Sequence, residues 1–283
     1  MTGRRWQKNR QPWRTTEGRL YMKLIVQSDD YGITRAAALG ALEAIRNGVV
    51  RNTGFFTNMP WAEECYEWIK PYEKDIAFGI DLNASTGSSV LGFDRVPNLC
   101  HEDGSFYTSK ENRELDTDEN DHDHVDYDQI YAEFEAQILK FEKICGRLPD
   151  YIHNHAYGTK TTMLASRALA EKYRRPWTTA LMQRKEVTPA GMGWYAFGGG
   201  LEEQLHTDPA AYITSDRDGL LKNEYGYIVC HCGYVDADLF KYSSFNICRA
   251  NDVACMTGET MKNWIRENHI ELISFKDLPE DWY

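Results

Sequence analysis

Short apolar segments alternate with longer amphipathic segments along most of the chain. The run KLIVQS at 23–28 is typical of a buried strand, and a helical pattern follows it at 33–47. In that pattern Leu39, Leu42 and Ile45 fall on one side of the predicted helix. Further strands are predicted at 49–56, 75–81, 151–153, 177–181, 225–230 and 270–275, and further helices at 61–69, 127–145, 163–173 and 260–268. This alternation indicates parallel βαβ units, so the predicted fold class is α/β, either a barrel or a doubly wound sheet.

The first 21 residues differ from the rest in charge. Residues 1–21 carry six basic side chains against the single acidic Glu17, and no apolar run follows that could serve as a signal-peptide core. We therefore expect a basic extension outside the fold. Residues 22–283 are predicted to form one domain, because no repeat or Pro/Ser-rich linker divides them.

A long acidic insertion near 83–126 interrupts the alternation and is predicted to be irregular. Within it Asp116, Asp118 and Asn120 resemble the first half of a calcium-binding loop. However, Asp121 occupies the position of the glycine that such a loop needs for its turn. We therefore expect a solvated surface loop rather than a calcium site.

Charge and cysteine content narrow the class of protein. A net charge of −11 at pH 7 argues against a nucleic-acid partner, because binding to phosphates requires clustered Lys and Arg. No segment approaches the roughly 18 apolar residues that a membrane helix needs. The seven cysteines are scattered, which favours reduced thiols in a cytoplasmic protein. Cys230 and Cys232 flank His231, but a CxC pair without a second pair is a weak zinc motif.

Chemically capable side chains follow four of the predicted strands. They are Asp29 and Asp30, Asp81, His153 and His155, and His231. Functional groups gather at the carboxyl ends of strands in parallel α/β folds, so we expect these side chains to converge. Either aspartate of the adjacent pair alone could simply cap the following helix. Two adjacent aspartates that converge with Asp81 and two histidines favour a cation instead. Two carboxylates and one imidazole leave a coordination position for water, which is the arrangement of a catalytic metal and suits hydrolysis of an amide or ester.

Five motifs in order resemble the YdjC/ChbG family of carbohydrate deacetylases: SDDYG, GIDLN, PDYIHNH, CHCGYVD and HIELISFKDL. The resemblance spans about residues 22–278, nearly the whole chain. It implies a distorted (β/α) barrel of the polysaccharide-deacetylase (NodB-like) type with one divalent metal ion, Mg or Zn, with Mn as a further option. It also implies an N-acetylated sugar or oligosaccharide of the chitooligosaccharide type as substrate, and a homodimer.

The resemblance also implies a role for each site residue. Asp29 matches the general base, His231 matches the general acid, and Asp30, Asp81 and His155 match the metal ligands. The resemblance further places Tyr31, His153 and Arg249 against the substrate.

This chain departs from the family pattern at the metal site. Asp81 stands where the family has histidine, and His153 stands where it has aspartate. The two changes compensate if His153 rather than Asp81 is the third ligand. Cys232 replaces the proline that follows the acid. Two other functions are therefore compatible with the sequence: a hydrolase of the same fold acting on another acylated or phosphorylated small molecule, and a non-catalytic carbohydrate-binding protein with a decayed site.

Overall fold

A computed structural model describes residues 22–116, 123–196 and 199–282. The predicted basic extension and the calcium-like positions Asp118, Asn120 and Asp121 lie outside these ranges. Within them, none of the helices is both long enough and apolar enough to cross a lipid bilayer.

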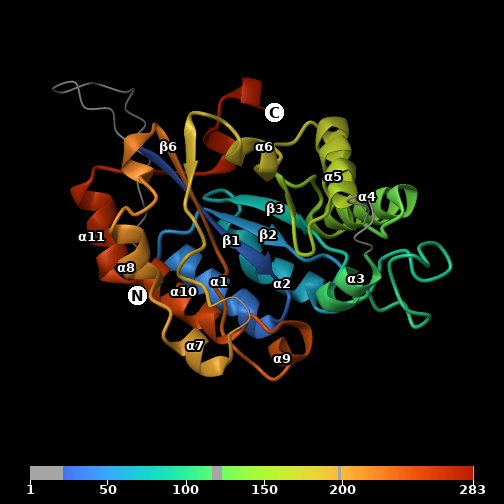
Figure 1. The fold of residues 1–283 in the computed structure, drawn as a ribbon. Coiled ribbons are helices and arrows are strands. Elements are labelled where there is room, and N and C mark those ends of the chain that lie inside the picture. The colour runs from blue at the N-terminus through green and yellow to red at the C-terminus, as the bar shows by residue number, and fades with distance from the viewer. Residues whose placement is uncertain (1–21, 117–122, 197–198, 283) are drawn as a thin grey trace.

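A parallel sheet of seven strands forms the centre of the described chain (Figure 1). Its strands are β1 (Lys23–Tyr31), β2 (Asn52–Phe55), β3 (Ala77–Leu82), β4 (Ile152–Asn154), β5 (Val187–Pro189), β6 (Tyr225–Cys230) and β7 (Glu271–Ile273). The order across the sheet is β4-β3-β2-β1-β6-β5, and β7 pairs with the first residues of β1. Helices connect the parallel strands, which confirms the predicted α/β class and the distorted (β/α) barrel.

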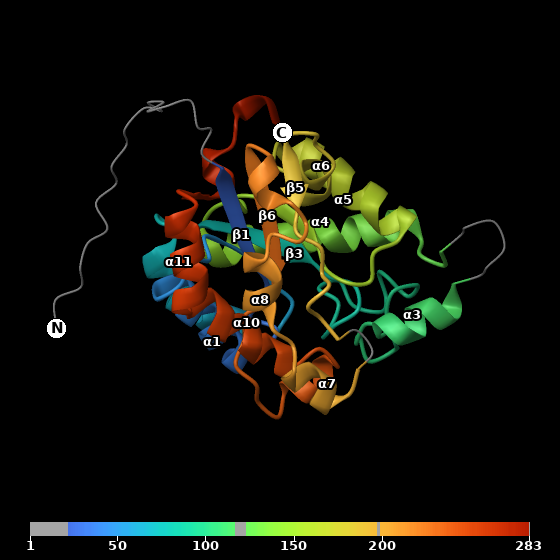
Figure 2. The same cartoon turned by 60° about the vertical axis from the view of Figure 1, so that its left-hand side comes forward.

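Helices surround this sheet. They are α1 (Arg35–Arg46), α2 (Ala62–Ile69), α3 (Ser109–Leu115), α4 (Tyr127–Cys145), α5 (Lys160–Tyr173), α6 (Thr178–Met182), α7 (Leu201–Leu205), α8 (Pro209–Thr214), α9 (Leu239–Tyr242), α10 (Ile247–Thr257) and α11 (Glu259–Glu267). Short 3-10 turns lie at Lys70–Tyr72, Leu220–Lys222, Phe275–Asp277 and Glu280–Trp282. Helices α1, α10 and α11 gather beside β1 and β6 (Figure 2), while α4 packs against α5 on the β3–β4 side.

Local sequence explains where the main elements begin and end. The hydroxyl of Thr34 accepts a hydrogen bond from the backbone N–H of Ala37 and caps α1. Asp126 caps α4 in the same way, and Gly146 ends that helix with a φ of 70°, a conformation that glycine adopts without strain. Strand β1 is buried on both faces: Leu24 packs in the larger of two apolar clusters and Ile25 in the smaller. Burial on both faces is expected for the central strand of a parallel sheet.

Several sequence predictions are wrong in detail. Residues 177–181 do not form a strand: Trp177 makes a single bridge to Ile152, and the chain then enters α6. Leu39 is 46% exposed and does not share the buried side of α1 with Leu42 and Ile45. The insertion is not wholly irregular, because α3 lies within it.

One buried carboxylate fastens the insertion to the body of the protein. Glu133 of α4 is fully buried and accepts hydrogen bonds from the Ser89 hydroxyl (2.7 Å) and from the backbone N–H groups of Val90 (2.9 Å) and Leu91 (3.1 Å). Gln137, one turn further along α4, donates a further hydrogen bond to it at 2.8 Å. Two backbone N–H groups of the insertion therefore depend on one side chain.

We expect Glu133→Ala to destabilise the protein by about 2–4 kcal/mol, because it leaves buried N–H groups without an acceptor. Chemical denaturation of the variant measures this free energy of unfolding. Glu133→Gln is the control, since it retains the volume and one acceptor oxygen and should lose less. Equal stability of Glu133→Ala and the parent would contradict the proposed anchoring.

Candidate active site

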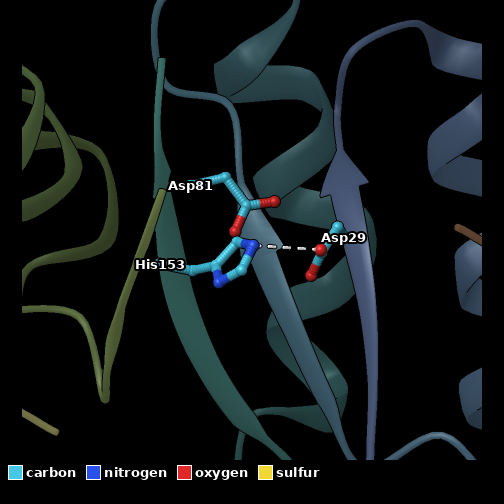
Figure 3. Close-up of side chains that lie close together, drawn as sticks. All are labelled: Asp29, Asp81 and His153. Carbon is cyan, nitrogen blue, oxygen red and sulfur yellow. Dashed lines mark ion pairs between the residues drawn. The ribbon is translucent and has the colours of Figure 1, made fainter. Parts of the chain in front are cut away.

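Three of the polar residues singled out in the sequence, Asp29, Asp81 and His153, converge at the carboxyl edge of the sheet (Figure 3). Asp29 and Asp30 lie at the end of β1, Asp81 near the end of β3, and His153 on β4. Asp81 and His153 are register partners on adjacent strands, so their side chains lie side by side. The prediction that these strand ends meet is thereby confirmed for these residues.

Asp29 is held by neighbours on two strands, β1 and β4. One of its oxygens accepts a hydrogen bond of 2.5 Å from Gln27 Nε2, and the other lies 3.1 Å from His153 Nε2. Gln27 is itself held by the hydroxyl of Tyr227, which donates to its Oε1 at 2.6 Å, and His153 Nδ1 lies 2.6 Å from the hydroxyl of Thr178. The Asp29 carboxylate therefore has a fixed orientation and is 4% exposed.

Asp30 points to the other side of β1. Its φ of 66° lies in the left-handed region that non-glycine residues seldom adopt, at the point where the pairing of β1 with β2 shifts register. Its Oδ2 accepts a hydrogen bond of 2.6 Å from the guanidinium of Arg249, and its Oδ1 lies 2.8 Å from His155 Nδ1. The backbone N–H of Asp30 donates to Asp81 Oδ2 at 2.7 Å. The unusual backbone conformation thus joins Asp30 to Asp81.

Asp81 occupies space that a glycine leaves open. A Cβ atom placed on Gly54 of β2 would come within 1.6 Å of Asp81 Oδ1, so any larger residue at position 54 would displace this carboxylate. Asp81 Oδ1 is buried and has no hydrogen-bond partner among the described residues. A buried carboxylate oxygen without a partner is costly and is a natural position for a cation.

The ionisation of these groups reflects their crowding. Burial raises the pKa of Asp81 well above its ordinary value, and the neighbouring charge of Asp29 raises it further. Burial also opposes ionisation of Asp29 and Asp30, but His153 lowers the pKa of Asp29, and His155 and Arg249 lower the pKa of Asp30 by more than burial raises it. Burial lowers the pKa of His153, yet Asp29 outweighs it and the pKa rises to about 9. Asp81 is the acid whose negative charge the protein does not neutralise.

Two sets of ligands around Asp81 could hold a divalent cation. Within the described part of the chain, Asp29, Asp81 and His153 form the set whose ligand atoms all lie within 4.8 Å of one another. The set expected from the sequence is Asp30, Asp81 and His155. In that set Asp30 and His155 touch, but the three do not form an equally tight group. Asp81 belongs to both sets.

His231, at the end of β6, is oriented by two residues that sequence reasoning missed. Its backbone N–H donates to Asp252 Oδ2 at 2.7 Å, and its Nδ1 lies 3.1 Å from the hydroxyl of Tyr195. Burial lowers the pKa of His231 to about 4, although Asp30 and Asp29 oppose that shift. The imidazole is therefore within electrostatic range of the carboxylate centre and neutral at pH 7.

Tyr195 also borders a cavity of about 440 Å³. The cavity is lined by Gly193, Trp194, Tyr195, Ala196, Glu203, His206, Thr207, Asp208, Ala211, Tyr212, Ser215 and Arg217. Aromatic rings and polar groups thus share one hollow, and Tyr195 connects it to His231 through its hydroxyl.

The structure also places Tyr31, Arg249 and the cysteines, which the sequence analysis singled out. Tyr31 is fully buried among Phe55 and Phe78, and its hydroxyl donates to the carbonyl of Cys65, so its ring has no surface to offer a substrate. Arg249 is 2% exposed, and its guanidinium donates a hydrogen bond to the carboxylate of Asp30. The seven cysteines are all free.

Among the site residues that the sequence analysis did not identify, only Gln27 lies in a sequence pattern that could have revealed it. It is a polar side chain inside the apolar run KLIVQS, at a position buried in the sheet. Thr178, Tyr195 and Asp252 reach the site from distant segments, and nothing in their local pattern distinguishes them.

Comparison with known proteins gives the family. The model of the family described as YdjC-like protein matches residues 23–267. A relative named carbohydrate deacetylase 2, from Listeria innocua, is 27% identical over 92% of this chain and 100% of its own. A carbohydrate deacetylase of Thermoanaerobacter pseudethanolicus is also 27% identical, over 90% of this chain and 98% of its own.

A solved structure agrees with these matches. It is a protein of Enterococcus faecalis described as a candidate cellobiose-phosphate cleavage protein, with a TM-score of 0.75 and 25% identity over 90% of this chain and 98% of that chain. The family model covers most of the chain, and the motifs that suggested the family are those that supply the carboxyl-edge residues. The chain belongs to the YdjC-like family.

Proposed function

We propose that this chain is a metal-dependent hydrolase that removes acetyl groups from N-acetylated sugars or oligosaccharides of the chitooligosaccharide type. The observation that carries the proposal is the buried Asp81 oxygen without a hydrogen-bond partner, in a cluster of carboxylates and imidazoles. The names of the two bacterial relatives support the reaction class. The cavity lined by aromatic and polar side chains beside His231 offers a site for a sugar ring.

Asp30, Asp81 and His155 are the proposed ligands. Carboxylate oxygens and one imidazole are a donor set that Mg, Mn and Zn accept. A divalent cation bound there would polarise the acetamide carbonyl and acidify a water molecule. Arg249 neutralises one oxygen of Asp30 and orients the other toward His155. Asp29, Asp81 and His153 are the competing ligand set.

Proton transfer falls to residues outside the coordination sphere. Asp29, fixed by Gln27 and His153, is the proposed base that takes a proton from the attacking water. His231 is the proposed acid that gives a proton to the departing amine. Because its pKa is about 4, His231 must first take up a proton from solvent before it donates one, and Asp29 returns the proton it has taken to solvent once the amine has left.

We expect Asp29→Asn to lower kcat by about 10²- to 10⁴-fold while metal stays bound, because the amide keeps the shape of the base without its proton affinity. Acetate release and metal content, measured by elemental analysis after dialysis, check the two halves of this prediction. Loss of the metal instead would assign Asp29 to the competing ligand set. Full activity would show that Asp29 is not the base.

Activity is tested by acetate release from N-acetylglucosamine oligomers with Mg, Zn or Mn added. If protein that holds metal released no acetate from any of a broad panel of acetylated sugars, the proposal would be wrong. A second candidate function is hydrolysis of a phosphorylated or otherwise acylated small molecule, which the description of the Enterococcus faecalis structure favours. Phosphorylated sugars and esters therefore belong in the same screen. A site that stays empty with each metal would indicate a non-catalytic carbohydrate-binding protein.

A cytoplasmic location and a homodimer complete the proposal. Cell fractionation tests the location, and light scattering of the purified protein tests the dimer.

A further inference from the structure

A chain of hydrogen bonds runs from Asp252 through Tyr195 to His231. The Tyr195 hydroxyl lies 2.5 Å from Asp252 Oδ2 and 3.1 Å from His231 Nδ1. Asp252 is fully buried and Tyr195 is 8% exposed, so water does not compete strongly for these contacts. The same Asp252 oxygen accepts the backbone N–H of His231 at 2.7 Å. Asp252 therefore holds His231 directly as well as through Tyr195.

Three distant segments build this arrangement. Tyr195 precedes α7, Asp252 lies on α10, and His231 follows β6. Phe245 packs edge-on against both rings, with ring centroids 4.6 Å from Tyr195 and 5.1 Å from His231. The imidazole thus contacts both aromatic rings, with its centroid 5.6 Å from that of Tyr195, and its plane has little freedom to turn.

The direction of the hydrogen bonds follows from counting protons. A phenol has a single proton to donate, whereas an ionised carboxylate can only accept. The Tyr195 proton therefore points to Asp252, and the phenolic oxygen is left to accept a proton from His231 Nδ1. Burial and the neighbouring Asp252 raise the pKa of Tyr195 well above its ordinary value, so the phenol keeps its proton. His231 Nε2 makes no hydrogen bond to any residue in the described ranges.

We propose that Tyr195 is a positioning residue that connects His231 to Asp252 and keeps the neutral imidazole in the tautomer with its proton on Nδ1. This tautomer leaves the Nε2 lone pair available to the reacting groups. It is also the form that His231 reaches after it gives an Nε2 proton to the departing amine, so the Tyr195–Asp252 pair stabilises the imidazole in the state the reaction leaves it in. The inference rests on the proposed role of His231 in sugar deacetylation.

The tautomer can be measured without a substrate. Nitrogen-15 NMR of the imidazole side chains, with His231→Gln used to assign the signals, reports which ring nitrogen of His231 carries the proton. We expect a protonated Nδ1 and an unprotonated Nε2 in the parent protein, and a mixture of tautomers in Tyr195→Phe. A proton on Nε2 in the neutral parent protein, or an unchanged spectrum in Tyr195→Phe, would overturn the inference.

Kinetics provide the second readout. We expect Tyr195→Phe to lower kcat on the order of 10²-fold, the lower end of what general acid–base residues contribute, with little change in KM. Tyr66→Phe is the matched control, because it removes another buried phenol, whose hydroxyl donates to the carbonyl of Cys145 at 3.1 Å outside the site. A change confined to KM would show that Tyr195 binds substrate and does not position His231.

The two proposals can fail separately. If the parent protein releases no acetate from any sugar but NMR shows Nδ1 protonated through Tyr195, the proposed function fails and the positioning role stands. If acetate is released and Tyr195→Phe is indistinguishable from Tyr66→Phe, the positioning role fails alone. If Tyr195→Phe does not fold, the parent spectrum and Asp252→Asn decide, since Asp252→Asn should weaken the same tautomer preference.

Discussion

Replacing Asp81 with asparagine is expected to abolish metal binding and acetate release together. Asp81 belongs to both candidate ligand sets, so the result does not depend on which set is correct. Its ionised form also opposes folding: burial and Asp29 raise its pKa, so negative charge at pH 7 costs free energy in the metal-free protein. Asparagine removes that charge, and we expect the melting temperature of the metal-free variant to rise by about 2–4 °C. Isothermal titration with metal and thermal unfolding measure the two effects.

A matched control lies just before the first residue of β4, away from the carboxyl edge of the sheet. Asp150 precedes that strand and accepts the backbone N–H of Phe78 at 2.8 Å, away from the carboxylate centre. Asp150→Asn should leave metal binding intact and should not raise the melting temperature. If Asp81→Asn bound metal as tightly as the parent, the centre would not be where we place it.

Exchanging Asp81 and His153 with each other is expected to preserve metal binding that Asp81→His alone weakens. The two residues are register partners on β3 and β4, so the double variant Asp81→His/His153→Asp keeps one carboxylate and one imidazole at the same place. We expect Asp81→His to lose at least about 10²-fold in metal affinity and the double variant to regain most of it. His153→Asp leaves the three proposed ligands in place and should keep more affinity than Asp81→His.

Titration of metal into the parent, both single variants and the double variant completes a thermodynamic cycle. A double variant as weak as the weaker single variant would mean that the two positions do not act as a pair. In that case the departures from the family pattern at these positions would be independent changes. Each protein should also be checked for folding by thermal unfolding, because both positions lie within the sheet.

Periodicity predicted the fold class because buried strands and amphipathic helices dominate the chain. The strand that carries Asp29 and Asp30, and the helix that ends at Gly146, follow from local patterns that tertiary contacts do not override. Helix α10 was missed for a reason that the site explains. Its buried residues include Arg249 and Asp252, so its apolar period is interrupted where the helix contributes to the site.

The sequence predicts where the site lies in the fold, but it does not predict which side chains in the site bond to one another. Strand ends located Asp29, Asp30, Asp81 and His153, because parallel strands bring their carboxyl ends together. Which carboxylate pairs with which base depends on the left-handed backbone of Asp30, which turns its side chain to Arg249 and leaves Asp29 to His153. The spacing of residues in the sequence does not predict that backbone conformation.

The pairing of β1 also has a consequence for how the chain acquires its structure during synthesis. Strand β1 is made early, yet β6, beside it in the sheet, follows about 200 residues later, and β7 later still. A ribosome adding roughly 5–20 residues per second leaves β1 without these neighbours for about ten seconds or more. During that interval the buried acids at its end face water rather than Arg249. We therefore expect the nascent chain to expose an apolar strand edge that chaperones can bind until its last helices and strands emerge.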